Sequence, residues 1–281
     1  MPGKPSPTLR RRELAARLRE LRTASGMTAD DVAERMLVSP AKISRIETGV
    51  RGVSLRDVRD LCEIYGVGST EASHLAALVR ESKQPSWWQS YDLPYATFVG
   101  LEAAAGTILD YESSLVPALL QTVDYARAAV EGILYDSPAD VIGQRVEARI
   151  TRQRILAQAS PPHLWTVVDE AVLRRVVGGP DVMRAQLETL VDRAALPNVT
   201  LQVVPFEVGA HPGMDSTFTV LHLDAEVADI VYIEGLVGNL YQESPTDLAR
   251  YRAAFDQLRA IALSPKESVA RISAIAKTHV G

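Results

Sequence analysis

Helix start and stop signals recur at short intervals between residues 13 and 81, and no other feature restricts the fold of this chain as strongly. Each start is a serine or threonine that can accept a hydrogen bond from the first helical turn, and the first two stops are glycines. Apolar residues recur between these signals at helical spacing. The starts are Thr28, Ser39, Ser54 and Ser69, and the stops are Gly26 and Gly49. The pattern predicts five short helices in one compact all-α domain.

The second and third of these helices have the features of a helix-turn-helix. Such a motif needs two short helices, a tight turn, and a second helix whose outward side chains reach base edges. Ala33 is small enough to let the two helices approach closely, and residues 36–38 make the turn. Ile43 and Ile46 anchor the second helix. The predicted DNA-binding residues are Thr28, Ser39, Ala41, Lys42, Ser44, Arg45 and Arg51.

These residue types suit contacts with DNA. Arg45 can donate two hydrogen bonds to a guanine edge, and Lys42 can donate to guanine or to phosphate. N–H groups at a helix start bind phosphate oxygens, which places Thr28 and Ser39 beside the DNA backbone. A solvated basic helix in a domain that binds protein would carry the same charges, so that alternative stays open at this point.

Charge is divided unevenly along the chain. Residues 1–84 contain 15 Lys and Arg against 11 Asp and Glu, whereas the other 197 residues contain 15 against 24. A basic block followed by an acidic one indicates a module that binds a polyanion and a second module with a different task. The sequence therefore favours double-stranded DNA as a partner of the first block.

Several classes of protein are excluded by simple counts. The single cysteine, Cys62, leaves no internal disulfide framework and no cysteine-rich zinc site. No apolar run approaches the length of a membrane helix, and Arg10 to Arg12 are not followed by an apolar stretch as in a secretory signal. We therefore expect a cytoplasmic protein without membrane contact.

Proline, aromatic and strand signals predict the domain boundaries. We expect a disordered arm over residues 1–12, the helical domain over 13–81, an aromatic linker over 82–94 and a second domain over 95–281. The second domain reads as helical from residue 101 to 129. Strand patterns follow at residues 164–168, 199–204, 217–223 and 230–233. They predict a mixed α+β domain with a small antiparallel sheet.

The N-terminal motif resembles a known family. Leu18 to Arg22, Gly26 to Thr28, Ala33, Ser39 and Ile43 to Gly49 are similar to the XRE-type, lambda-repressor-like helix-turn-helix domains. The resemblance implies a structural ion pair between Arg22 and Glu47, and binding as a homodimer to two half-sites about one DNA turn apart. Many members carry polar side chains where this chain has Pro40 and Ala41. Readout is therefore expected to depend on Lys42, Ser44 and Arg45.

The rest of the chain resembles a second family, the uncharacterised domain that follows the helix-turn-helix in many actinobacterial regulators. Matching phrases include Val116 to Thr122, Asp169 to Arg174 and Tyr232 to Glu234, with Ala118 where most members have glycine. The resemblance implies a domain that senses a signal or binds a partner, and such regulators are often encoded beside a small acidic partner protein.

Candidate ligand-binding residues are few. Polar and aromatic side chains that could bind a small-molecule effector or a partner are Trp87, Trp88, Tyr111, Glu112, Gln121 and Glu170. The alternative is that they are ordinary helix surface, caps and hinge residues. A mainly apolar cavity with a few polar groups would favour a small-molecule receptor, and a large exposed apolar patch would favour a protein-docking module.

Enzyme motifs are missing from the sequence. It contains no glycine-rich phosphate loop, no nucleophile elbow and no HExxH. His211, Asp215 and His222 are too isolated to predict a metal site. We therefore expect no catalysis, no metal and no cofactor. An enzyme with an accessory helix-turn-helix stays as the distant alternative.

Overall fold

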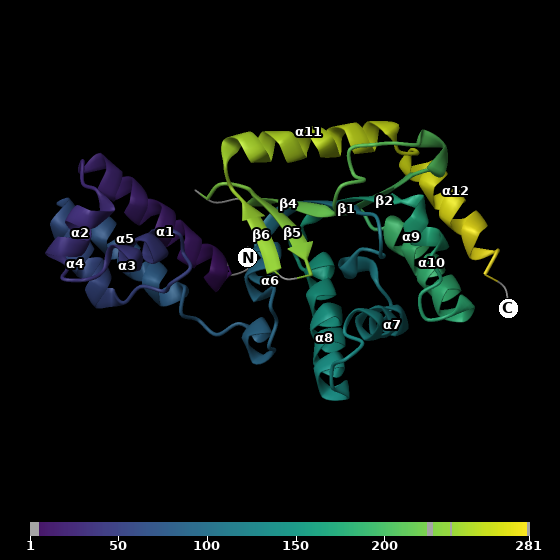
Figure 1. Ribbon diagram of the computed structural model, residues 1–281, viewed down its shortest axis with the longest axis horizontal. Coiled ribbons are helices and arrows are strands. Elements are labelled where there is room, and N and C mark those ends of the chain that lie inside the picture. The colour runs from purple at the N-terminus through teal and green to yellow at the C-terminus, as the bar shows by residue number, and fades with distance from the viewer. Residues whose placement is uncertain (1–5, 224–226, 237, 280–281) are drawn as a thin grey trace. The chain divides into compact units, whose positions relative to one another are not determined.

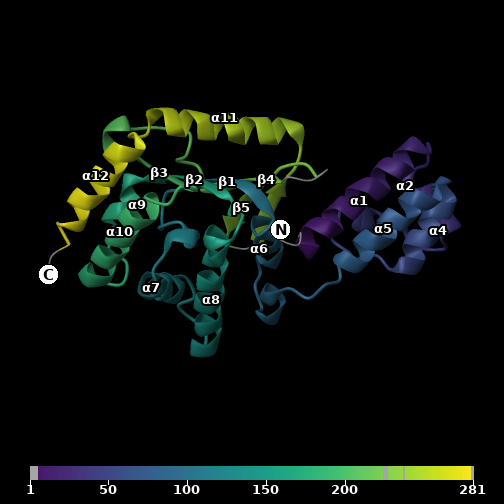
Figure 2. The ribbon, with the colours of Figure 1, turned by 180° about the vertical axis from the view of Figure 1, so that it is seen from behind.

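The computed structural model describes residues 6–223, 227–236 and 238–279. The chain folds as two compact units, one formed by residues up to Ser90 and the other by Tyr91–Leu223 with the described residues from Ala228 on (Figures 1 and 2). No helix within the described ranges is long and apolar enough to span a membrane.

The N-terminal unit is helical, as predicted. Its described residues form five α-helices: α1 (Pro7–Ala24), α2 (Ala29–Arg35), α3 (Pro40–Glu47), α4 (Leu55–Tyr65) and α5 (Ser69–Glu81). Thr28 with Asp31 closes a capping box at α2, and Ser54 with Asp57 closes another at α4. The apolar face of each helix meets in one core, which includes Leu14, Leu18, Val32, Ile43, Ile46, Leu61, Leu75 and Leu78.

The first helix begins earlier than the sequence predicts. Pro7 occupies its first turn, and the Ser6 side chain accepts a hydrogen bond from the Thr8 N–H. A serine cap followed by proline starts a helix because proline has no N–H to satisfy there. The prediction of a disordered arm over residues 1–12 is thus wrong for residues 7–12. Its first five residues lie outside the described part of the chain.

The predicted linker contains local structure. Trp87–Ser90 forms a short 3₁₀ turn in which the Ser90 hydroxyl donates to the Trp87 carbonyl at 2.6 Å. The rings of Trp87 and Trp88 meet edge to face with their centroids 5.8 Å apart. The two aromatic side chains therefore contact each other within a turn and are not part of an extended tether.

The second unit is built on a six-stranded mixed sheet among its described residues. Its strands are β1 (Ala105–Glu112), β2 (His163–Asp169), β3 (Val199–Val204), β4 (Phe218–Leu223), β5 (Ile230–Gly235) and β6 (Gly238–Gln242). The strand order is β3-β2-β1-β4-β5-β6. Neighbouring pairs among β1, β2 and β3 are parallel, and the pairs from β1 through β4 and β5 to β6 are antiparallel.

The prediction of a small antiparallel sheet is therefore wrong in size and holds for only part of the sheet, since β1, β4, β5 and β6 pair antiparallel and β1, β2 and β3 pair parallel. Residues 105–112, predicted to be helical, form β1, which joins the parallel half of the sheet to the antiparallel half. A parallel pair needs a long helical crossover, and residues between β1 and β2 supply it. Short apolar runs do not reveal such pairing, because helix and buried strand share that pattern.

Helices cover both faces of the sheet. They are α6 (Ala96–Glu102), α7 (Val123–Ile133), α8 (Ala139–Arg152), α9 (Glu170–Arg174), α10 (Pro180–Ala194), α11 (Pro245–Ile261) and α12 (Pro265–Ala276). Helix α11 lies along one face, and α7 and α8 lie on the opposite side (Figures 1 and 2). Phe255 and Leu258 of α11 pack against Tyr111 of β1 in one apolar cluster.

Side chains alternate along β1, and this alternation positions the site described below. Tyr111 packs in the cluster under α11, so its neighbours in the strand point to the other face. On that face, Ile108, Asp110 and Glu112 line a cavity.

Candidate functional site

The helix-turn-helix has the tight geometry that the sequence predicts. The Val38 N–H donates to the Ala33 carbonyl at 2.9 Å, and Ala33 is buried between the helices. Leu37 adopts φ +54° in the turn, a left-handed conformation that is uncommon outside glycine, and its side chain is 92% exposed. This turn holds α3 against α2 with one face outward.

Helix α3 separates its anchors from its outward side chains. Ile43 and Ile46 are buried, while Ala41, Ser44 and Arg45 are exposed. The Arg45 Nε donates to the Ala41 carbonyl at 3.1 Å, which leaves the guanidinium on the solvent side of the helix. Arg51, beyond the helix, is also exposed. These positions can reach a DNA groove without unfolding the motif.

The two predicted phosphate contacts differ in their local bonding. The Thr28 hydroxyl is used within the capping box of α2, where the Asp31 N–H donates to it at 3.2 Å. Ser39 precedes α3 but makes no side-chain cap hydrogen bond. Since the first N–H groups of a helix have no intrahelical acceptor, the start of α3 keeps donors for an anion.

Lys42 is less exposed than Ala41, Ser44 and Arg45 on the same helix. Its Nζ lies 2.7 Å from Oδ1 of Asp57, at the start of α4. Asp57 also accepts hydrogen bonds from the Ser54 N–H and hydroxyl, at 3.1 and 2.7 Å. The ammonium group is therefore committed to a contact inside the domain.

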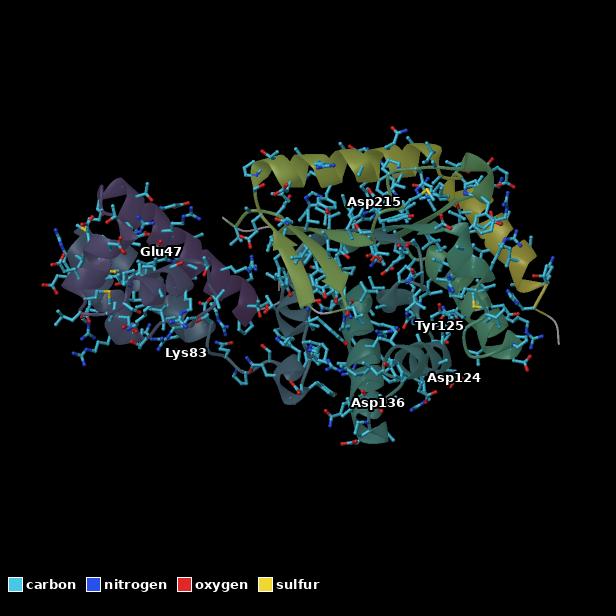
Figure 3. All side chains as sticks on the ribbon, in the orientation of Figure 1. Glu47, Lys83, Asp124, Tyr125, Asp136 and Asp215 are labelled. Carbon is cyan, nitrogen blue, oxygen red and sulfur yellow. The ribbon has the colours of Figure 1, made fainter. Side chains whose placement is uncertain are left out.

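Glu47 (Figure 3), the last residue of α3, lies beside Arg22 of α1. Nε and Nη2 of Arg22 lie 2.7 and 2.9 Å from the two carboxylate oxygens of Glu47, and Nη1 donates to the Met27 carbonyl at 2.8 Å. The Glu47 hydrogen bond raises the pKa of Arg22 against the opposing effect of burial. The pair joins α1 to the end of α3.

The candidate residues of the second unit do not form one site. Glu112 and Gln121 line the same cavity, whereas Tyr111 is buried on the other face of β1. Glu170 is buried in an ion-pair cluster, 2.7 Å from Nε of Arg174 and 2.6 Å from Nη1 of Arg271. Trp87 and Trp88 belong to the N-terminal unit and are not lining residues.

The cavity has a volume of about 230 Å³ and lies entirely within the C-terminal unit. Its walls come from β1, β4, β5, α6, α8, the end of α7 and the loop before α7. Tyr125 on α7 (Figure 3) braces this loop, since its hydroxyl accepts a hydrogen bond from the Val116 N–H at 3.1 Å. The charged lining residues are Glu102, Asp110, Glu112, Arg149, Arg152 and Glu234. The cavity is more polar than the mainly apolar one expected of a receptor.

Two of these charges neutralise each other. Glu102 and Arg152 are both buried and form a bidentate pair at 2.8 and 2.9 Å.

Burial raises the pKa of Asp110 to about 6, although the Thr219 hydroxyl donates to its carboxylate at 2.9 Å. Burial also raises the pKa of Glu112, and the nearby charge of Asp110 adds to the effect. Asp110 and Glu112 therefore hold protons more firmly than exposed carboxyl groups do.

Sequence reasoning missed most of the cavity. Asp110 lies in the strand β1, which the sequence predicts as helix, and Tyr232 stands in a phrase that resembles the second family but does not indicate a binding role. One signal was present: Arg149 and Arg152 lie one turn apart on a helix whose neighbouring positions Val146 and Ala148 are buried. Arginines near an apolar face indicate buried charge that needs a partner.

Two histidines of the second unit, His211 and His222, contact different carboxylates. His211 Nε2 lies 3.1 Å from Asp169, and His222 Nδ1 lies 2.6 Å from Asp229. Across the ranges that the structure describes, no three His, Cys, Asp or Glu side chains are arranged to hold a metal ion.

Two family models match the chain. The Domain of unknown function (DUF5753) matches residues 95–274, which is more than half of the chain, and the Helix-turn-helix domain matches residues 13–75. Both matches confirm the resemblances found in the sequence. No curated protein and no solved structure matches the chain.

Proposed function

Because the chain belongs to the family of the Domain of unknown function (DUF5753) and carries a helix-turn-helix domain ahead of it, we propose that it is a sequence-specific DNA-binding transcriptional regulator. The outward face of α3 is the observation that carries this proposal. Ala41, Ser44 and Arg45 are exposed there, while Ile43 and Ile46 fix the helix from the other side. Arg45 is the side chain on this face that can read guanine. Such a role places the protein in the compartment that holds the DNA.

Selection of duplexes from a random pool by the full-length protein tests this proposal. We expect enrichment of one motif, made of two half-sites about one helical turn apart. Affinity for the enriched duplex should fall by about 10³-fold between roughly 50 and 200 mM salt, if each dimer makes about six phosphate contacts. No enriched motif, or an affinity that does not change with salt, would contradict the proposal.

We also propose that the protein acts as a homodimer held together by its C-terminal unit. Two linked helix-turn-helix domains bind two half-sites more tightly than one, because the second contact is intramolecular. Residues 1–84 alone should then bind the selected duplex more weakly than the full chain. Sedimentation of both proteins checks the assignment, and equal affinity of fragment and full chain would refute it.

The C-terminal unit is proposed to receive a signal and not to catalyse a reaction. A cavity with convergent charges supports a small molecule over a partner protein. A small acidic protein that shifts DNA affinity without occupying the cavity would favour the docking alternative. Turnover of a bound compound would favour the enzyme alternative.

A further inference from the structure

Four of the six charged side chains that line the cavity, Asp110, Glu112, Arg149 and Glu234, form no ion pair within the described residues. Arg149 is the only cation of these four. Arg149 donates from Nη1 to the side-chain oxygen of Gln121 at 3.2 Å, and its Nε is buried without a hydrogen bond. Among the residues that the structure describes, no ion pair joins Arg149 or Glu112 to an opposite charge. By contrast, Glu102 and Arg152, which line the same cavity, form a bidentate ion pair with each other.

A tyrosine hydroxyl beside these charges also lacks a hydrogen bond. Tyr232 on β5 is only 4% exposed, and its hydroxyl has no partner within the described part of the chain. It lines the same cavity as Arg149 and Glu112. A buried polar atom without a hydrogen bond costs about 1–3 kcal/mol, so two around one cavity, Nε of Arg149 and the Tyr232 hydroxyl, are unusual for a purely structural core.

The pattern of charges restricts what can fill the cavity. Arg149 needs an anionic acceptor, preferably a carboxylate that its planar donors match. Glu112 needs a cation or a hydrogen-bond donor. A ligand with only a carboxylate would leave Glu112 without a cation, and a ligand with only an ammonium group would leave Arg149, whose Nε is buried, without an acceptor. A ligand that carries both charges satisfies both groups at once.

The size of the cavity and its apolar lining restrict the ligand further. At about 230 Å³ the cavity is smaller than the roughly 300–1,000 Å³ of sites for drug-sized ligands. Apolar walls are supplied by Phe98, Ile108, Leu115 and Leu119. The ligand therefore has few atoms, two opposite charges and a small apolar portion.

We propose that this cavity binds a free amino acid, with its carboxylate on Arg149 and its ammonium group on Glu112. The Tyr232 hydroxyl donates a further hydrogen bond to the carboxylate. Burial and the charges of Asp110 and Glu234 raise the pKa of Glu112, while Arg149 and Arg152 oppose them, so an ammonium group stabilises the ionised form. The inference deepens the proposed function, because the cavity lies in the unit proposed to receive the signal.

Calorimetric titration of the full-length protein, without DNA, tests the assignment. The probes are the individual proteinogenic amino acids at millimolar concentration, and for each one that binds, its methyl ester and its N-acetyl derivative. We expect saturable binding of at least one amino acid, weakened at least about tenfold in either derivative, since each derivative loses one charge. No saturable binding of any amino acid, or equal binding of a derivative, overturns the proposal.

Three variants locate the ligand. Glu112→Gln, Arg149→Gln and Tyr232→Phe should each weaken binding, the first two by at least about tenfold. Tyr232→Phe removes a hydroxyl without a partner, so its melting temperature without ligand should equal or exceed that of the parent. Arg127→Gln and Glu131→Gln, exposed on α7 outside the lining, are matched controls that should bind like the parent. Two results together would show that the amino acid does not bind in this cavity. The first is an unchanged affinity of a Tyr232→Phe variant that folds like the parent, and the second is an equal affinity of the cavity variants and the two control variants.

Failure of this inference is distinguishable from failure of the proposed function. A protein that selects a DNA motif but binds no amino acid keeps the function and loses the inference. A protein that binds an amino acid through Arg149 but selects no DNA motif keeps the inference and loses the function.

Discussion

Lys42 on α3 and Asp57 on α4 lie 2.7 Å apart, at the place where the capping box of α4 is closed. Burial raises the pKa of Asp57, but hydrogen bonds from Lys42 and from Ser54 outweigh it and lower the pKa to about 2. Lys42 on α3 thus stabilises the N-terminal unit through its contact with α4.

Replacement of Lys42 should affect stability more than DNA readout. Lys42→Ala is expected to cost about 0.5–1 kcal/mol of unfolding free energy, since the pair is partly exposed to solvent. Asp57 stabilises the fold above about pH 4 and loses this contribution as pH falls towards about 2, because its folded pKa lies below its unfolded one. Acid unfolding followed by circular dichroism should therefore begin at higher pH in the variant. A large loss of DNA affinity at unchanged stability would show that Lys42 leaves Asp57 to contact DNA.

Arg22→Ala should destabilise the N-terminal unit by about 2–4 kcal/mol. Glu47, only 7% exposed in its side chain, would lose both guanidinium hydrogen bonds and stay buried as a charge. Arg17→Ala on the same helix is the matched control, because its partners Glu20 and Glu71 are much more exposed and the loss should stay below about 1 kcal/mol. Thermal melts of the two variants check the difference, and equal melting temperatures would argue against the pair's structural role.

Asp110→Asn should stabilise the C-terminal unit at neutral pH. The folded pKa of Asp110, about 6, lies above its unfolded value, so ionisation costs stability once pH rises through about 6. The cost disappears as pH falls towards about 4, where the folded and unfolded forms are both protonated to a growing extent. The Thr219 hydroxyl can still donate to the asparagine oxygen. We expect a gain on the order of 2 kcal/mol at about pH 7 and almost none at about pH 4, measured by denaturant unfolding. The same gain at both pH values would exclude ionisation as its cause.

Gly213→Ala should destabilise the second unit through Tyr111. A Cβ atom at position 213 would lie 2.3 Å from two ring carbons of Tyr111, and this ring is fully buried beside Phe218. Overpacking of this kind costs about 1–3 kcal/mol. Gly143→Ala, inside α8 with no atom near its Cβ position, should instead stabilise by up to about 1 kcal/mol. The sign of the change in melting temperature tests both predictions. A lower melting temperature of Gly143→Ala would show that the space at its Cβ position is filled.

The helical half of the fold was predictable because its signals are local. A cap such as Thr28 with Asp31 acts within one turn, and the sequence shows both members. The start of α1 at Pro7 depends on the same kind of signal, Ser6 before proline, in a stretch whose prolines resemble a disordered arm.

Four strands, β2 to β5, were predictable from the sequence, but the pairing of the strands, the strand β1 and the cavity were not, because the residues that meet there are far apart in the sequence. Asp110 pairs in register with Thr166 on one side and with Thr219 on the other. Only this pairing shows that residues 105–112 form a strand, and only the strand shows that Tyr111 and Glu112 point to opposite faces. The contact between Lys42 and Asp57 was not predictable for the same reason, since Asp57 lies on the next helix.

Arg45→Ala tests the central claim most directly, because Arg45 is exposed on α3 and its side chain supports no other element. Binding of the full-length variant and the parent should be measured on the selected duplex and on a scrambled duplex at one salt concentration. The account predicts a loss of about 1–3 kcal/mol on the selected duplex, relaxed preference at one base pair and an unchanged melting temperature. Equal affinity of variant and parent for the selected duplex would contradict readout through the outward face of α3.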